Sequence, residues 1–200
     1  MALDLNQIYS ASHAYPAYRE YLDQLIEGGK TTGDTQNEKY LEYTKLNIVR
    51  MNRNDKTVQL NDTQLAKLSD CPAAKMLVIG DAWCGDTAQI IPVLHKMVEA
   101  SAGKWEMRII SRDTYPELIE TYLTNGARSI PKILFLNEHN EVINTWGPRP
   151  ASALAILKNW KANQDTMSKE DFEKELHLWY AKDRGQEIVN ELLAVLTQMV

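Results

Sequence analysis

The stretch Trp83-Cys84-Gly85-Asp86-Thr87, which comes shortly after the apolar run Met76-Leu77-Val78-Ile79, decides the fold that we expect of this chain. An unbroken apolar run is typical of a strand that is buried on both faces. The residues from Asp86 to about Ala100 read as a helix, so the strand delivers Cys84 to a helix start. Thr87 stands three residues after Cys84, where a dithiol protein carries its second cysteine. The arrangement therefore suggests thiol–disulfide chemistry that uses one cysteine.

Composition excludes several classes of protein. The chain has 200 residues, a net charge of −5 and no block of Lys and Arg, which argues against a nucleic-acid partner. No apolar run approaches the ~18 residues of a membrane span, and the first twenty residues do not resemble a secretory signal. Two cysteines are too few for a disulfide scaffold. We therefore expect a cytoplasmic protein with no membrane association.

The first part of the chain, residues 1–70, reads as a helical N-terminal extension. We predict a helix with Pro16 in its first turn that ends at Gly28-Gly29, and two more helices over about 35–53 and 62–68. This extension is rich in tyrosine, which suits either a packed interface or one wall of a cleft over Cys84. The tyrosines concerned are Tyr9, Tyr15, Tyr18, Tyr21, Tyr40 and Tyr43.

The pattern changes to alternating strands and helices in residues 71–162. Strands are predicted over 76–79, 105–110, 132–136 and 142–146, and helices over 86–100, 115–123 and 151–161. Strand–helix–strand followed by a hairpin and a helix describes a small α/β layer with a mixed sheet. Residues 163–200 form a C-terminal helical tail. Its apolar stripe runs as far as Met199, with an interruption at Gly185 and a helix start resembling a capping box at Ser168.

Residues 73–162 resemble the thioredoxin fold. Trp83-Cys84-Gly85 is similar to the family's W-C-G-x-C, and Pro92 falls where the family kinks this helix. Ser129-Ile130-Pro131 resembles the family's I-P element, whose proline is cis. Gly147 follows Pro131 by sixteen residues and matches a family glycine after the last strand. The resemblance implies an α/β thioredoxin-like mixed sheet flanked by helices, here with added helical N-terminal and C-terminal segments.

The chain is most similar to a bacterial thioredoxin-like subfamily with a W-C-G-D motif and a helical N-terminal extension. The shared elements are Arg50-Met51-Asn52-Arg53, Leu123-Thr124-Asn125-Gly126-Ala127-Arg128-Ser129-Ile130-Pro131-Lys132 and Trp146-Gly147-Pro148-Arg149-Pro150. This likeness covers most of the chain and implies little about its substrate.

The setting of Cys84 has opposing effects on its ionisation. A helix N-terminus places partial positive charge and free N–H groups at the sulfur, which lowers the pKa of a thiol. Thr87, one helical turn on, can offer a hydroxyl hydrogen bond to the thiolate. Asp86 works against a second negative charge, although it is also a typical helix-start residue. From the sequence alone, the direction of the shift stays open.

Three arginines are predicted to lie near the thiol. In open α/β sheets, the ends of the strands carry the ligand sites. Arg112 follows the strand 105–110, Arg149 follows the strand 142–146, and Arg128 comes shortly before Pro131. Together they could bind carboxylates such as those of glutathione, or stabilise the thiolate. The alternative for each arginine is an ordinary solvated or ion-paired side chain.

Departures from the family limit the chemistry. Because Thr87 replaces the resolving cysteine, only an external thiol can release a mixed disulfide on Cys84. The family's buried acid would fall at Val78, and Asp81 is expected to point elsewhere. These differences argue against dithiol reductase activity.

The remaining cysteine and the histidines suggest no further chemistry. Cys71 precedes the first strand while Cys84 follows it, too far apart for a disulfide without rearrangement. The four histidines share no spacing with one another or with Cys84, so no metal site is predicted. They are His13, His95, His139 and His177.

We therefore expect a monothiol redox protein without a bound cofactor. Cys84 would exchange with a disulfide-containing protein or a small-thiol mixed disulfide, and glutathione or another small thiol would complete the cycle as co-substrate. Thr87 and Pro131 would assist at the reacting sulfur. We predict substrate-binding roles for Trp83, Gly85, Asp86, Arg112, Arg128, Ile130, Gly147 and Arg149.

Two other functions stay open. The first is a non-catalytic module that binds an extended peptide in the same groove, with Cys84 incidental. The second borrows from monothiol glutaredoxins, which this chain resembles in using one cysteine and which can share an iron–sulfur cluster across a dimer. Such a cluster would need Cys84 plus external glutathione as ligands. The sequence leaves the oligomeric state open.

Overall fold

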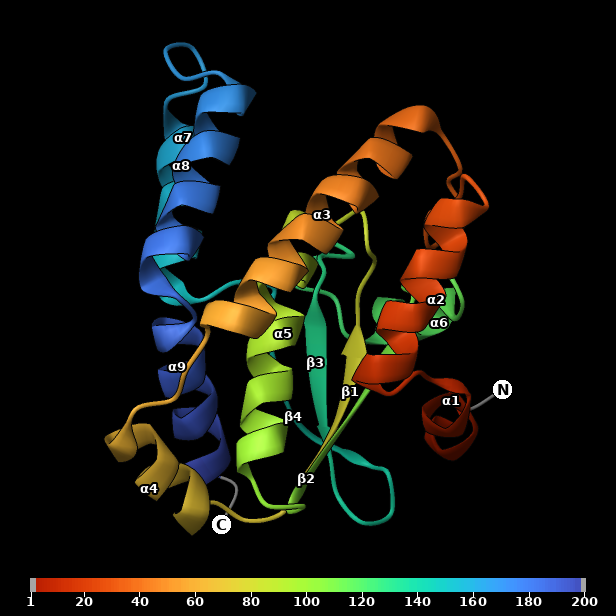
Figure 1. Ribbon diagram of the computed structural model, residues 1–200, viewed down its shortest axis with the longest axis vertical. Helices are drawn as coiled ribbons and strands as arrows, with labels where there is room; N and C mark the ends of the chain where they lie inside the picture. Colours follow the sequence, from red (N-terminus) through yellow and green to blue (C-terminus); the bar gives the residue numbers. More distant parts are fainter. Residues whose placement is uncertain (1–2, 199–200) are drawn as a thin grey trace.

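A four-stranded mixed sheet lies at the centre of the computed structural model, which describes residues 3–198. The strands are β1 (Ala74–Ile79), β2 (Trp105–Ile110), β3 (Lys132–Leu136) and β4 (Val142–Trp146), in the order β2-β1-β3-β4 (Figure 1). β1 pairs parallel with β2 and antiparallel with β3, and β3 pairs antiparallel with β4. The predicted α/β class with a mixed sheet is confirmed.

Helices cover both faces of the sheet, which explains why β1 is apolar throughout. Met76 and Val78 point into a core shared with α2 (Tyr15–Glu27), α3 (Glu38–Thr57), α5 (Gly85–Ala100) and the tail. Leu77 and Ile79 point into a second core with α1 (Leu5–Ala11) and α6 (Pro116–Thr121). Because successive side chains of a strand face opposite ways, a strand with two buried faces needs apolar residues at every position.

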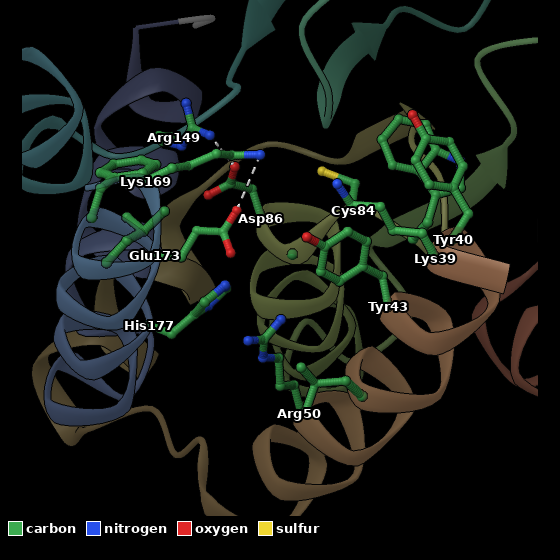
Figure 2. Close-up of a pocket in the computed structure, with 15 residues that line it drawn as sticks. Lys39, Tyr40, Tyr43, Arg50, Cys84, Asp86, Arg149, Lys169, Glu173 and His177 are labelled. Carbon is green, nitrogen blue, oxygen red and sulfur yellow. Dashed lines mark ion pairs between the residues drawn. The ribbon is translucent and has the colours of Figure 1, made fainter. Parts of the chain in front are cut away.

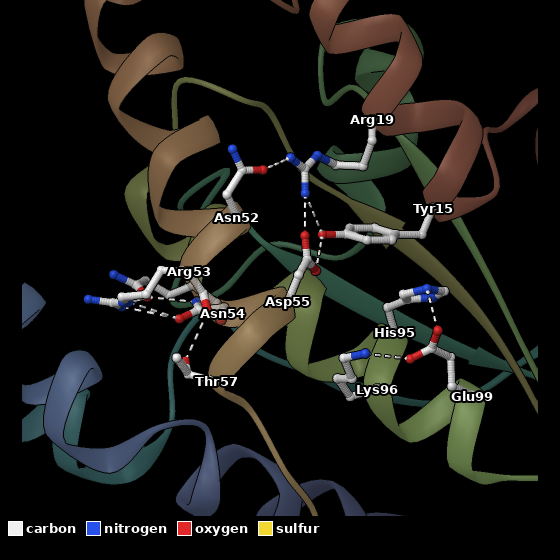
Figure 3. A network of polar contacts seen from close by, with 11 residues as sticks. Tyr15, Arg19, Asn52, Arg53, Asn54, Asp55, Thr57, His95, Lys96 and Glu99 are labelled. Atoms are coloured by element: carbon white, nitrogen blue, oxygen red, sulfur yellow. Dashed lines mark hydrogen bonds and ion pairs between the residues drawn. The ribbon is translucent and has the colours of Figure 1, made fainter.

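The N-terminal extension packs on the sheet through helices close to those predicted. α2 has Pro16 in its first turn and ends at Gly28, while α4 (Asp62–Asp70) starts with a capping box between Asn61 and Gln64. Polar contacts tie α2 to α3. The Tyr15 hydroxyl donates to Asp55 Oδ1 at 2.8 Å, and Arg19 pairs with the same carboxylate at 2.5 Å (Figure 3). α1 is an additional helix that the sequence did not resolve.

Two helix ends differ from the prediction. α3 continues to Thr57, four residues beyond the predicted end. α6 stops at Thr121 because the chain enters a turn in which Thr124 and Ala127 bridge to each other. Within that turn Asn125 and Gly126 both have positive φ, which a helix does not allow.

The C-terminal tail docks on the sheet domain. α8 (Lys169–Asp183) runs back along α7 (Ala151–Ala162), and α9 (Gln186–Thr197) continues beyond α8 beside α5 (Figure 1). The Ser168 hydroxyl caps α8 by accepting a hydrogen bond from the Asp171 N–H at 3.1 Å. The same hydroxyl donates to the Asp171 carboxylate, so this carboxylate does not accept from the Ser168 N–H as it would in a capping box. The predicted interruption at Gly185, which has φ +81°, separates α8 from α9. Met199 lies outside the described residues.

Among residues 3–198, no helix combines the length and the apolar character required to cross a membrane.

Candidate functional site

Cys84 is the N-cap residue of α5, directly after the loop that follows β1. Its Sγ donates a hydrogen bond to the carbonyl oxygen of Ile130 at 3.4 Å. The Ile130–Pro131 peptide bond is cis, as is Gly147–Pro148. The structure thus brings Cys84 and the Ile130-Pro131 dipeptide together from two separate segments, the grouping that the sequence suggested.

A pocket of about 410 Å³ opens over Cys84 between α3 and α8. Tyr40 and Tyr43 of α3 form one wall, so these two tyrosines of the extension line a cleft over the thiol (Figure 2). The full lining comprises Lys39, Tyr40, Tyr43, Leu46, Arg50, Trp83, Cys84, Gly85, Asp86, Arg149, Lys169, Phe172, Glu173, Leu176 and His177.

Asp86 lies buried in the first turn of α5, with 5% of its surface exposed. Its Oδ2 pairs with Arg149 Nη2 at 2.5 Å, and its Oδ1 accepts a hydrogen bond from the Tyr180 hydroxyl at 2.8 Å. Burial raises the pKa of Asp86, while Arg149 and then Tyr180 act in the opposite direction. Arg149 therefore faces the pocket with its guanidinium already engaged, unlike the free anion-binding arginine that we predicted.

The Cys84 thiol is harder to ionise than an ordinary cysteine. Burial is the largest cause, and the negative charge of Asp86 adds to it, so that the pKa of Cys84 rises to about 11. Thr87 and the backbone at the helix start lower the pKa, but by less. The Thr87 hydroxyl is buried against Gly80 and forms no hydrogen bond of regular geometry, so it supports the thiolate only weakly. The sequence left open whether the pKa of Cys84 is raised or lowered, and the structure shows the causes that raise it.

Arg112 and Arg128 do not line the pocket, contrary to the expected ring of three arginines. The Arg112 guanidinium lies over the Trp83 ring, 5.0 Å from its centroid, and pairs with Asp113 at 3.0 Å. Arg128 is exposed and pairs with Glu120. Each of the two guanidinium groups is thus held by an acidic side chain of its own region, Asp113 or Glu120, and this pairing cannot be seen from sequence position alone.

Trp83, Gly85 and Gly147 shape the site through close contacts. Trp83 stacks on Tyr40 with ring centroids 4.7 Å apart. A Cβ atom on Gly85 would lie 2.7 Å from His177 Cε1, so only glycine lets α8 approach this closely. Gly147 has φ +114° and lies directly against the Pro131 carbonyl oxygen, where a side chain would not fit.

A family model described as Thioredoxin matches residues 33–161, which is more than half of the chain. The chain belongs to this thioredoxin family. Membership supports a thiol-redox type of function in general terms. The match includes β1, the Cys84 turn, Ile130-Pro131 and α3, so the pocket wall formed by Tyr40 and Tyr43 falls within the family region.

Two solved structures have the same fold over their full lengths. One is a protein of unknown function from Pseudomonas aeruginosa, with a TM-score of 0.62, 14% identity and complete coverage of both chains. The other is an HIV epitope scaffold, with a TM-score of 0.63, 15% identity and coverage of 98% of this chain and 99% of that one. At these identities the likeness concerns the fold alone.

Sequence reasoning missed the part of the site that α8 contributes in this thioredoxin-family chain, above all His177. His177 lines the pocket with Cys84 although the two are far apart in the sequence and share no spacing. Arg50 was noticed only as part of a motif, yet it also lines the pocket. The available signal was the spacing of Glu173 and His177, which lie four residues apart next to the apolar stripe of α8. This spacing places both on one side of a helix, but it does not show which part of the protein that side faces.

The second cysteine stands apart from this site. Cys71 and Cys84 are both free, and Cys71 is buried with 3% exposed. Asp81 is fully buried, and its Oδ1 accepts from the Ser111 hydroxyl at 2.6 Å. Within residues 3–198, no group of three or more His, Cys, Asp or Glu side chains is arranged to hold a metal ion.

Proposed function

We propose that this protein is a monothiol member of the thioredoxin family in which Cys84 forms a mixed disulfide with a substrate bound in the pocket. The observation that carries this proposal is the position of Cys84. Its sulfur lies at the start of α5, beside the Ile130 carbonyl and at the floor of an open pocket. Neither Thr87 nor the buried Cys71 can act as a resolving thiol.

The exchange takes place in two balanced steps. Cys84 loses its proton to solvent, and the thiolate attacks one sulfur of the substrate disulfide. A new Cys84–substrate disulfide forms, and the other sulfur leaves with the electron pair and takes up a proton. An external thiol, such as glutathione or another small thiol, then attacks the mixed disulfide and frees Cys84. The substrate is a disulfide-containing protein or a small-thiol mixed disulfide, in a compartment such as the cytoplasm that supplies reduced thiols.

The high pKa of Cys84 makes this exchange slow. With a pKa of about 11, only a very small fraction of the sulfur is ionised at pH 7, and attack is slower than for a thiol with a pKa near 7. The same basicity makes Cys84 a poor leaving group, so a mixed disulfide persists once it has formed. These properties favour capture of a thiol partner over rapid turnover.

A second candidate function is a non-catalytic binding module. The observation that favours it is the burial of the thiol together with Asp86, which keeps Cys84 protonated at neutral pH. In this case the pocket recognises its ligand through the walls contributed by α3 and α8, and Cys84 is incidental.

The two functions separate in a transfer experiment. In a Cys71→Ala background, a glutathionylated peptide is incubated with the protein and reduced glutathione, and release of the peptide thiol is compared with that for Cys84→Ser. Thiol exchange predicts that release depends on Cys84 and that glutathione appears on Cys84 by mass spectrometry. Equal release with Cys84→Ser contradicts the monothiol function and leaves the binding module.

A further inference from the structure

We propose that the pocket binds a small thiol or disulfide that carries a carboxylate, held by Arg50 of α3 and His177 of α8 while the ligand sulfur reaches Cys84. The sulfur half of this inference rests on the proposed function, whereas the carboxylate half rests on the donors of the pocket alone. Neither Arg50 nor His177 belongs to the residues that the sequence assigned to substrate binding.

Arg50 is a cation without a carboxylate partner among residues 3–198. Its Nη1 donates to the Asn47 side chain at 2.7 Å, and no Asp or Glu oxygen lies within ion-pair distance. Two other cations of the pocket are engaged, Arg149 with Asp86 at 2.5 Å and Lys169 with Glu173 at 3.4 Å (Figure 2). A third, Lys39, lies over the Tyr43 ring, 5.9 Å from its centroid. Arg50 is also half-buried, so its charge is poorly solvated. The negative charges that act on it, Glu173 and Asp86, are each paired with another cation, which leaves its guanidinium available to an incoming anion.

The hydrogen bonds around His177 determine which of its nitrogens carries the proton. Gln89 Oε1 accepts from Asn54 Nδ2 at 2.9 Å and from Arg53 Nη2 at 3.1 Å, which fixes the orientation of the Gln89 amide. Gln89 Nε2 therefore donates to His177 Nδ1, 3.2 Å away. The His177 proton then resides on Nε2. Burial, with Arg50 next, lowers the pKa of His177 to about 3, so the ring is a neutral N–H donor at pH 7.

The two donors converge beside the thiol. Arg50 Nη1 lies 3.4 Å and His177 Nε2 lies 3.0 Å from the position of a Cβ on Gly85. Gly85 directly follows Cys84 and opens α5, whose N-terminal N–H groups add partial positive charge. Figure 2 shows both side chains pointing into the pocket from facing helices. A guanidinium fork and an N–H at one point match a carboxylate, which accepts through both oxygens.

The rest of the pocket suits the body of a small ligand. Its volume of about 410 Å³ falls within the ~300–1,000 Å³ of small-molecule sites. Tyr43, Phe172 and Leu176 line it with apolar surface. Asp86, Glu173 and an ionised Cys84 would repel a dianionic disulfide, so any preference for such a disulfide must come from Arg50 and His177.

A series of small disulfides with the same two-methylene linker and different terminal charges tests the proposal. Dithiodipropionate, hydroxyethyl disulfide and cystamine are anionic, neutral and cationic, and each forms a mixed disulfide with a distinct mass. In a Cys71→Ala background, we expect the anionic disulfide to react fastest with Cys84. Arg50→Gln should slow that reaction about tenfold, the loss of one charge-assisted contact, and leave the neutral disulfide within about twofold. His177→Gln should cause a smaller, equally selective loss.

Lys45→Gln is the matched control for Arg50→Gln. Lys45 lies on the same helix, is exposed and pairs with Glu42 at 2.7 Å, outside the pocket. It should leave all three rates unchanged. Rates with dithiodipropionate that do not depend on Arg50 or His177 would overturn the carboxylate subsite while leaving thiol exchange intact.

A binding measurement separates the two halves of the inference. In Cys84→Ser, the binding of methylthiopropionate and of its neutral amide is measured by isothermal titration calorimetry. The subsite predicts that the carboxylate binds more tightly and that Arg50→Gln removes the difference. If this result holds while no disulfide reacts with Cys84, then the proposed redox function fails and the subsite stands. Equal binding of acid and amide overturns the subsite.

Discussion

Asp86, buried in the turn of α5 that also carries Cys84, forms an ion pair with the partly buried Arg149, with 2.5 Å between Oδ2 and Nη2. The pair joins the helix start to the loop after β4. Its negative partner lies two residues from the thiol and is the second cause, after burial, of the raised pKa of Cys84. The reactivity of the thiol therefore depends on how this carboxylate is compensated.

Removing the carboxylate should make Cys84 more acidic. With Asp86→Asn, we expect the pKa of Cys84 to fall by about one unit, because a like charge nearby disfavours the thiolate. The pH dependence of alkylation by iodoacetamide, measured in a Cys71→Ala background, reports this pKa. Asp62→Asn, in the exposed first turn of α4, is the control and should leave the profile unchanged. An unchanged profile in Asp86→Asn would contradict the role assigned to Asp86.

Breaking the ion pair from the other side should destabilise the fold. Arg149→Met leaves Asp86 buried without its cation, which we expect to lower the free energy of unfolding by about 3–5 kcal/mol. In the double variant Asp86→Asn/Arg149→Met the loss should be clearly smaller, because no buried charge remains. Urea unfolding of the single and double variants completes the cycle. Additive losses would mean that the two side chains do not act as a pair.

His177 should make the protein less stable as the pH falls. The pKa of His177 is about 3 in the folded protein and 6.5 in an unfolded chain. Between these two pH values, His177 is protonated in the unfolded chain and neutral in the folded protein. Stability from this group is present above the unfolded pKa and is lost on acidification, by at most about 1.4 kcal/mol per pH unit. His177→Gln should flatten this slope, as measured by urea unfolding from pH 7 to about pH 4. His139→Gln, in an exposed turn, should keep the wild-type slope.

A side chain at Gly147 should disturb the contact with Pro131. Gly147→Ala combines positive φ with a clash against the Pro131 carbonyl oxygen. Gly126→Ala also introduces a side chain at positive φ, +76°, but with open space around it. We expect both variants to lose about 1 kcal/mol or more to backbone strain, and Gly147→Ala to lose clearly more. Equal thermal shifts for the two variants would show that the contact contributes nothing.

Much of the fold was predictable because its elements are coded locally. The strands 105–110, 132–136 and 142–146 were predicted with the bounds that the structure has. Each combines apolar residues with adjoining turn residues, so pairing and burial follow from the pattern. The ends of α3 and α6 were less accurate, because where a helix stops depends on what its last turn packs against.

The site was predictable only in part. The resemblance grouped Cys84 with Ile130 and Pro131, and the structure places them in contact. Arg112 and Arg128 were assigned to the same site because their strand ends lie on that edge, but each is held by a neighbouring acid. His177 was overlooked because the way the tail folds back against α5 leaves no periodic signal in the sequence.

By itself, the sequence determined that a single cysteine stands at a helix start after a buried strand, with a threonine where a resolving thiol would be. These are properties of neighbouring residues, and spacing is enough to establish them. Only the tertiary structure decided which charges face that sulfur and how deeply it is buried, and hence that its pKa lies above the ordinary value. The reason is physical: burial and charge act through space, and Arg50, Arg149 and His177 approach Cys84 from α3, the loop after β4 and α8, segments that only the folded core brings together.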